Sequence, residues 1–297
     1  MEIETDFPER WEYSDHPSVR ENGKMVVFSN FIHKELIPNI QSQYRTNNNK
    51  ILIGHSAMGH FTNYVLATFP EEWSCIISIS SFFKLKKFNL VDSIASKIGS
   101  ISSPVSFYTA QGDPHQDTNQ DLLFDSLYKE IKPNPYFNYK RYSYPFANHT
   151  TVSGIAIGEI LTDFWGKYNV RKIELGQKNY DSKGNIHPDT MIHVYTSLKN
   201  HYKDTIYYEL GNIIGSSGTY SSNKKYDQAI RILEYGIEQY PKYYQLYVFV
   251  AGNQYKLHSD STRHNTYILM AIDIVKNNPA IYEEPNDILA YLNSMLK

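Results

Sequence analysis

The chain has 297 residues, of which 41% are hydrophobic, and this is enough for one large domain or two ordinary domains with a buried core. It carries 29 lysines and arginines against 31 aspartates and glutamates, a formal net charge of −2, so the overall charge argues against nucleic acid or an anionic membrane surface as a partner. The single cysteine, Cys75, excludes an internal disulfide and a cysteine-based zinc site, and its apolar neighbours indicate a buried side chain.

Membrane and export signals are absent from the sequence as written. No run approaches the roughly 18 consecutive apolar residues that a membrane span needs. Residues 1–6 are acidic, whereas a signal peptide would begin basic and become apolar. We therefore expect a cytoplasmic chain without a membrane span, and a periplasmic or secreted one if the natural N-terminus is longer.

The first 170 residues alternate between helical and strand-like patterns. Apolar residues recur every three or four positions from residue 24 to residue 44, which predicts a helix that Pro38 kinks or restarts. Short apolar or alternating runs then predict strands at 50–54, 75–79, 104–109 and 136–144. Helices are predicted directly after the first strand and at 151–168. This alternation indicates βαβ units, so we expect an α/β fold with a mostly parallel sheet.

Beyond residue 170 the sequence changes to helices alone. Polar residues 176–185 predict a boundary loop. Five helices are predicted at 208–220, 226–240, 243–257, 262–277 and 286–296. Prolines at 241 and 279 close the second and fourth of these, 38 positions apart (279 − 241), and this period resembles tetratricopeptide repeats over about residues 205–280. Such helix hairpins stack their apolar faces, and their concave face would bind a protein partner.

The junction between the first strand and its helix, residues 54–59, reads G-H-S-A-M-G. It is close to the nucleophile elbow of α/β hydrolases, in which a serine occupies the tip of a sharp strand-to-helix turn with its hydroxyl exposed above the sheet. Ser56 is therefore the predicted nucleophile, and the backbone N–H of Ala57 is the predicted oxyanion donor. The usual pattern has a small residue two positions after the serine. Met58 occupies that position here, and Gly59 follows one position later.

A serine hydroxyl needs a base, and in this fold the chain order is serine, acid, histidine. His149 fits the position of the base, because it lies after the last predicted strand and directly before the last helix of this half. The acid should follow the third strand, where Asp113 is the first choice and Asp117 the second. His55 and His60 are expected in the wall of the substrate pocket or in packing around the elbow.

Several runs together resemble the esterases related to enterochelin esterase and esterase D. They are FIHKELIPNI at 31–40, YRT at 44–46, IGHS at 53–56, FP at 69–70 and ISIS at 77–80, with a histidine near the end of this half. The resemblance covers about residues 1–168. It implies an α/β-hydrolase domain that hydrolyses carboxylic esters through a Ser-His-acid triad without a metal or cofactor.

Several strands ordinarily precede the nucleophile in this fold, together with a loop that gives a second oxyanion donor. Only 55 residues precede Ser56, and they predict one helix, so we expect the chain to lack the N-terminal strands and to be a fragment or remnant of a longer esterase. The expected organisation is a truncated α/β-hydrolase domain at 1–170, a linker with packing helices at 171–204 and a tetratricopeptide-like region at 205–297.

These observations predict a serine hydrolase that acts on a small-molecule carboxylic ester. Thioesters and siderophore, feruloyl or acetyl esters are all open as substrates. The alternative is a catalytically impaired remnant that serves as a protein-interaction module through its C-terminal helices, or helices that only cap the hydrolase core. No phosphate-binding glycine loop, metal-ligand cluster or basic stripe in the sequence argues for other chemistry.

Overall fold

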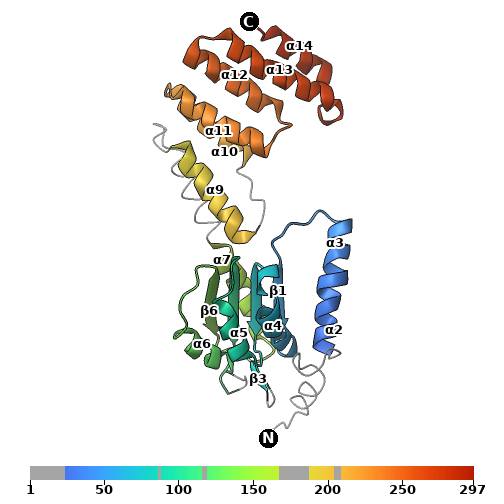
Figure 1. Ribbon diagram of the computed structural model, residues 1–297, viewed down its shortest axis with the longest axis vertical. Helices are drawn as coiled ribbons and strands as arrows, with labels where there is room; N and C mark the ends of the chain where they lie inside the picture. The colour runs from blue at the N-terminus through green and yellow to red at the C-terminus, as the bar shows by residue number, and fades with distance from the viewer. Residues whose placement is uncertain (1–23, 86–87, 116–118, 167–186, 204–208) are drawn as a thin grey trace. The chain divides into compact units, whose positions relative to one another are not determined.

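The computed structural model describes residues 24–85, 88–115, 119–166, 187–203 and 209–297. These residues fall into two compact units, one within 1–166 and 200–204 and the other within 167–199 and 205–297 (Figure 1). The predicted boundary loop at 176–185 and the candidate acid Asp117 lie outside the described residues. Each unit is therefore described by itself.

The first unit is built on a four-stranded parallel sheet with the strand order β1-β2-β5-β6 (Figure 1). The strands are β1 (Ile51–His55), β2 (Cys75–Ile79), β5 (Val105–Gln111) and β6 (Phe137–Ser143). Two short antiparallel strands, β3 (Lys84–Leu85) and β4 (Phe88–Asn89), form a separate pair. Every residue of β2 and β5 is buried, as a parallel sheet requires of its central strands. The prediction of an α/β fold with a parallel sheet is confirmed.

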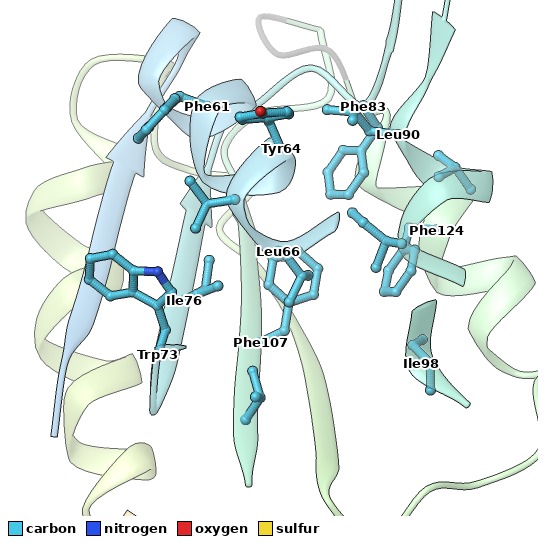
Figure 2. Packing of buried hydrophobic residues seen from close by; sticks show 14 of the residues in the cluster. Phe61, Tyr64, Leu66, Trp73, Ile76, Phe83, Leu90, Ile98, Phe107 and Phe124 are labelled. Atoms are coloured by element: carbon cyan, nitrogen blue, oxygen red, sulfur yellow. The ribbon is translucent and has the colours of Figure 1, made fainter. Parts of the chain in front are cut away.

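Helices cover both faces of the sheet. Ile76 and Phe107 share a buried cluster with side chains from α4 (Ala57–Thr68), α5 (Leu90–Ile98) and α6 (Asp121–Tyr128) (Figure 2). On the opposite face, Lys140 and Tyr142 of β6 bond to Asp163 of α7 (Val152–Phe164). The central strands β2 and β5 are thus buried between helices on the two faces, and the strand ends are left for the loops.

Aromatic rings form the centre of the cluster in Figure 2. The ring of Phe107 lies 5.6 Å from that of Phe124 and 6.3 Å from that of Phe83 between centroids. All three side chains have no exposed area. Burial of one such ring stabilises a fold by about 1.5–3 kcal/mol. This cluster is therefore a major source of stability for the first unit.

Burial also decides the chemistry of Cys75, the first residue of β2. Its side chain is buried, as the sequence predicted. Burial raises the pKa of the Cys75 thiol, because the charged thiolate is poorly solvated inside the protein. The thiol therefore acts as a small apolar side chain of the sheet.

The first helical segment changes pitch in front of Pro38. Helix α2 (Lys24–Phe31) continues into the π-helical turn η1 (Ile32–Leu36) and then into α3 (Ile37–Gln43). The N–H of Ile37 donates to the carbonyl of Ile32, five positions back. Proline has no N–H to donate, so the α-helical hydrogen bonds are interrupted here, and Pro38 lies in the first turn of α3, where this loss costs least.

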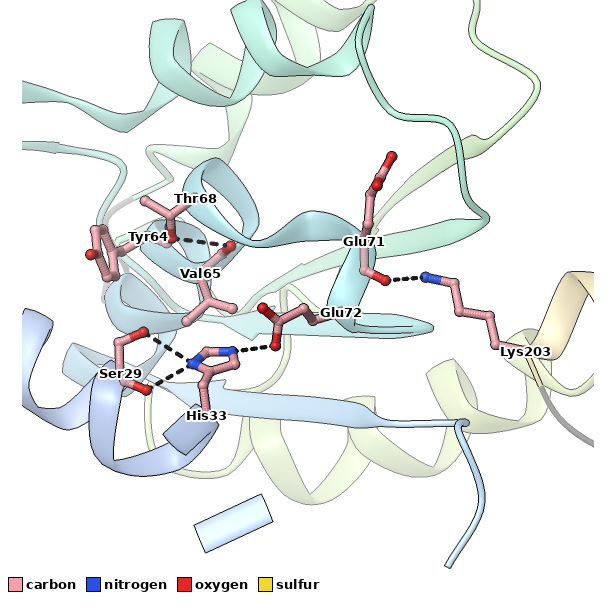
Figure 3. Close-up of polar contacts among 8 residues, drawn as sticks. All are labelled: Ser29, His33, Tyr64, Val65, Thr68, Glu71, Glu72 and Lys203. Atoms are coloured by element: carbon pink, nitrogen blue, oxygen red, sulfur yellow. Dashed lines mark hydrogen bonds and ion pairs between the residues drawn. The ribbon is translucent and has the colours of Figure 1, made fainter. Parts of the chain in front are cut away.

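His33 of η1 ties this segment to the short helix η2 (Pro70–Glu72) that follows α4. Its Nδ1 donates to the carbonyl of Ser29 at 2.7 Å, and its Nε2 lies 3.5 Å from the carboxylate of Glu72 (Figure 3). The imidazole ring also packs 4.9 Å from the ring of Phe69. The N-terminal helical segment is thereby fixed to the end of α4 and to η2.

The second unit is helical throughout its described residues. Its main helices are α9 (Pro188–Tyr202, of which residues 200–202 count with the first unit), α10 (Leu210–Ser222), α11 (Tyr226–Gln239), α12 (Tyr244–His258), α13 (Ser261–Asn277) and α14 (Pro285–Ser294), with the short helix η3 (Pro279–Ile281) before the last. From α10 onward each long helix packs against the next. The predicted helical C-terminal region is confirmed, and its likeness to tetratricopeptide repeats stays a prediction.

One close contact shows how tightly these helices pack. A Cβ added to Gly236 of α11 would lie 2.8 Å from the side chain of Ile213 in α10. Glycine therefore lets the two helices approach at this point. Within the described ranges, no helix is long and apolar enough to cross a membrane.

Candidate active site

The turn after β1 holds Ser56 in an unusual backbone conformation. Ser56 has φ 58° and ψ −119°, in the half of conformational space that favours glycine. Strand β1 ends at His55 and helix α4 begins at Ala57, so the whole turn is a single residue. The N–H of Ser56 donates to the carbonyl of Ile79 at the end of β2, at 2.9 Å. A strained serine between the end of a strand and the start of a helix is the local geometry of a nucleophile elbow.

Two glycines make the turn possible. A Cβ on Gly54 would lie 2.2 Å from the carbonyl oxygen of Met58, and a Cβ on Gly59 would lie 2.6 Å from the Cβ of Ser81. The side chain of Met58 is 41% exposed and meets no such restriction. The glycine that this elbow needs is thus three positions after the serine, which accounts for the departure from the usual pattern.

His149 reaches the serine from the loop between β6 and α7. Its Nε2 lies 3.0 Å from Oγ of Ser56, although the two residues are 93 positions apart. The turn that carries it is fixed locally, because Oδ1 of Asn148 accepts hydrogen bonds from the N–H groups of Thr150 and Thr151. A histidine nitrogen at this distance can accept the proton of the serine hydroxyl.

The loop after β5 lies against the loop that carries His149. A Cβ on Gly112 would lie 2.5 Å from the carbonyl oxygen of Ala147, and the N–H of Asp113 donates to the same carbonyl at 2.6 Å. Oδ1 of Asp113 accepts a hydrogen bond from the N–H of His115 at 2.9 Å. The contacts thus bring the predicted acid loop beside the base loop. Asp117, the second candidate, is outside the described residues.

The two other predicted site histidines have different partners. Nε2 of His55 lies 2.6 Å from the carbonyl oxygen of His149, and the two rings are 4.7 Å apart between centroids. His60 is buried in α4, with 2% of its side chain exposed, and its Nδ1 lies 2.8 Å from the carbonyl of Phe82. His55 therefore contacts His149 beside Ser56, whereas His60 is buried in α4 and contacts the backbone of Phe82.

A buried polar network under the elbow was not predicted from the sequence. Oγ of Ser78 lies 3.0 Å from the carbonyl oxygen of Gly59 and 2.7 Å from Oγ of Ser81, and Nδ2 of Asn63 donates to Oγ of Ser81 at 3.1 Å. Ser80, between them, has φ 47°. The network ties the end of β2 to helix α4. The signal for it was the run S-I-S-S at 78–81, which begins inside the buried strand β2 and continues past its end.

The start of α4 supplies backbone donors beside Ser56. Ala57 is the first residue of this helix, and the first N–H groups of a helix have no partner within it. Such groups point along the helix axis and favour a negative charge. Over the described residues, no group of three histidine, cysteine, aspartate or glutamate side chains is placed to hold a metal ion.

The fold and the elbow together define an α/β-hydrolase type of protein. The family model described as "Putative esterase" matches residues 2–230, so the chain belongs to this esterase family. Family membership supports an esterase or hydrolase function. A search of curated proteins gives no match.

Two solved structures share the fold. An uncharacterised protein from Capnocytophaga ochracea is 13% identical with a TM-score of 0.63, covering 95% of this chain and 79% of its own. An IroE-like serine hydrolase from Shewanella oneidensis is 16% identical with a TM-score of 0.51, covering 76% of this chain and 70% of its own. At these identities the likeness shows the fold alone.

Proposed function

We propose that this protein is a serine hydrolase that cleaves carboxylic esters, with Ser56 as nucleophile and His149 as base. The single observation that carries the proposal is the 3.0 Å distance between Nε2 of His149 and Oγ of Ser56, with Ser56 at a strained strand-to-helix turn. A hydroxyl is a weak nucleophile at neutral pH, and a histidine within hydrogen-bonding distance is the usual means of activating it.

The proposed reaction has two halves. His149 accepts the hydroxyl proton of Ser56 while Oγ attacks the ester carbonyl carbon, and the N–H of Ala57 donates to the oxyanion that forms. When the carbonyl re-forms, the alcohol leaves with the proton from His149, and an acyl group remains on Ser56. Water then gives a proton to His149 and attacks the acyl carbonyl carbon, and when that carbonyl re-forms, His149 returns the proton to Oγ of Ser56 as the carboxylic acid leaves.

The acid of the triad is proposed in the loop after β5, as Asp113 or Asp117. Its task is to hold the tautomer of His149 and to stabilise the imidazolium that forms during attack. The contacts of Gly112 and Asp113 with Ala147 place the start of this loop against the histidine loop. We expect Asp113→Asn and Asp117→Asn to differ, with the true acid losing about 10⁴-fold in kcat by analogy with other triads.

A fluorescent fluorophosphonate, which reacts only with an activated serine, tests the proposal. Wild type should be labelled, and Ser56→Ala and His149→Ala should not be. Ser96→Ala, at an exposed serine of α5 that is not near the elbow in sequence, is the matched control and should label like wild type. Failure of a folded wild-type protein to label would contradict the proposal. A panel of nitrophenyl esters, thioesters and siderophore esters would then give the substrate class.

The helical unit supports a second proposal, that it binds a peptide of a protein partner. A groove of about 510 Å³ lies between the end of α11, the start of α12 and η3, and its lining includes Tyr240, Tyr243 and Tyr282, with Ile281 56% exposed. Peptide selection by phage display, with Ile281→Glu as the matched variant, tests this. Peptides that bind wild type and not the variant would support binding, and no enrichment over background would contradict it.

A further inference from the structure

His55 lies next to the nucleophile in the chain and bonds to the base in space. It is the last residue of β1, and its Nε2 lies 2.6 Å from the backbone carbonyl oxygen of His149, 94 positions away. His149 in turn places its own Nε2 3.0 Å from Oγ of Ser56. A closed ring of contacts results, from Ser56 through the chain to His55, across to the backbone of His149, and back through the His149 side chain.

The chemistry of the partner fixes the state of the His55 ring. A carbonyl oxygen only accepts hydrogen bonds, so Nε2 of His55 must carry the proton and donate it. The two imidazole rings are 4.7 Å apart between centroids.

The loop that carries His149 is largely exposed around the base. Its neighbours Phe146, Asn148 and Thr150 are exposed. The side-chain oxygen of Asn148 accepts hydrogen bonds from Thr150 and Thr151, which belong to the same turn. The N–H of Asp113 holds the carbonyl of Ala147, two positions before the base. The bond from His55 holds the backbone of His149 itself.

We propose that His55 is a positioning residue, which sets the distance between His149 and Ser56 by holding the His149 carbonyl. The inference rests on the proposed hydrolase function and deepens it. A strand end is a rigid support, whereas an exposed loop is not, so the bond transfers the rigidity of β1 to the base. The donor is half-buried, which strengthens the bond relative to one in water.

Two substitutions at His55 separate positioning from packing. His55→Gln keeps an N–H donor at nearly the same reach, whereas His55→Leu keeps a similar bulk and removes the donor. We expect His55→Leu to lower kcat for a nitrophenyl ester and the rate of fluorophosphonate labelling by about 10- to 100-fold, because a base displaced by an ångström loses that much. KM should change by less than about twofold, because the substrate contacts are kept. His55→Gln should retain most of the rate.

A matched control breaks an equivalent bond elsewhere. Nε2 of His264, buried in the second unit, lies 2.9 Å from the carbonyl of Met295, so His264→Leu should lower the melting temperature and leave kcat unchanged. If His55→Leu labels as fast as wild type, or if Gln and Leu slow the reaction equally, the positioning role is wrong while the hydrolase proposal stands. If wild type itself does not label, it is the hydrolase proposal that fails.

Discussion

The two units of the chain gather their contacts in opposite ways. In the first unit, the contacts that matter join distant residues, such as Ser56 and His149, 93 positions apart, at the ends of parallel strands. In the second unit, each helix from α10 to α14 packs against the next one in sequence. We therefore expect that chemistry and stability can be separated here, because loops at strand ends carry the proposed reactive groups and stacked helices carry mainly apolar contacts.

The largest expected effect follows from removing the paired groups of the first unit. Ser56→Ala and His149→Ala should each lower the rate of ester hydrolysis by at least about 10⁴-fold, and the double variant should be no slower than the slower single one. The reason is that each group is useless without the other. Steady-state rates for the three variants check this, and a double variant slower by the product of both effects would mean that the two groups act separately.

Core substitutions sharpen the comparison at the level of stability. Phe107→Ala in the first unit should lower the free energy of unfolding by about 3–5 kcal/mol, and Leu233→Ala in α11 by about 2–5 kcal/mol, because both side chains are fully buried. Urea unfolding followed by circular dichroism measures both.

The two core variants should differ in activity. Leu233→Ala should leave kcat per folded molecule unchanged, since its side chain packs within the helical cluster of the second unit. Phe107→Ala should lower kcat as well, because Phe107 lies on β5, which leads into the loop of the proposed acid. Equal losses of kcat in both variants would contradict the expectation that activity depends on the first unit alone.

Substitution of Gly54, in the strand before the elbow, should affect both the stability of the fold and the rate of labelling. An alanine Cβ at position 54 would lie 2.2 Å from the carbonyl of Met58, so Gly54→Ala should destabilise by about 1–3 kcal/mol. It should also slow labelling per folded molecule by up to about 100-fold, because the serine moves with the turn. Gly158→Ala in α7 is the control, since a Cβ there meets nothing within 4 Å, and it should stabilise by about 0.5–1 kcal/mol. Labelling of Gly54→Ala at the wild-type rate would contradict the tight-elbow interpretation.

The strands and most helices could be predicted because their patterns are local. The run at 75–79 matches β2 to the residue, and the predicted helix at 226–240 matches α11 within one residue. The short strands β3 and β4 were missed, because two residues carry no periodicity to read. The helix α5 was not predicted by its own range, although its buried residues Leu90, Val91, Ile94 and Ile98 follow the helical spacing of three and four.

The site was predictable in its order and not in its contacts. Serine before histidine, each after a strand, indicated that Ser56 and His149 would meet, since the carboxyl ends of parallel strands lie at one edge of a sheet. The bond from His55 to the carbonyl of His149 could not be predicted, because it depends on the exact path of a loop and leaves no pattern in the sequence. The same holds for Gly59, whose need appears only when Ser81 is seen 2.6 Å from its missing Cβ.

The smallest expected effect is a dependence of stability on pH at the edge of the first unit. The ammonium of Lys203 donates to the carbonyls of Glu71 and Trp73, at 2.7 Å and 3.0 Å (Figure 3 shows the first contact). Burial lowers the pKa of Lys203 to about 8, against the opposing attraction of the Glu71 carboxylate. An unfolded lysine keeps its proton until about pH 10.4.

The sign of that dependence follows from proton binding. Between pH 8 and about 10.4 the unfolded chain binds more protons at Lys203 than the folded one does, so the contribution of Lys203 to the free energy of unfolding should rise with pH in this window. The side chain is half-exposed, so solvent screening should keep the rise below about 1 kcal/mol. Urea midpoints of wild type and Lys203→Met at pH 7.5 and pH 10 give the difference between the two proteins at each pH. The urea midpoint of wild type, relative to that of the variant, should be higher at pH 10 than at pH 7.5. A relative midpoint that stays constant or falls would show that Lys203 stays charged in the folded first unit.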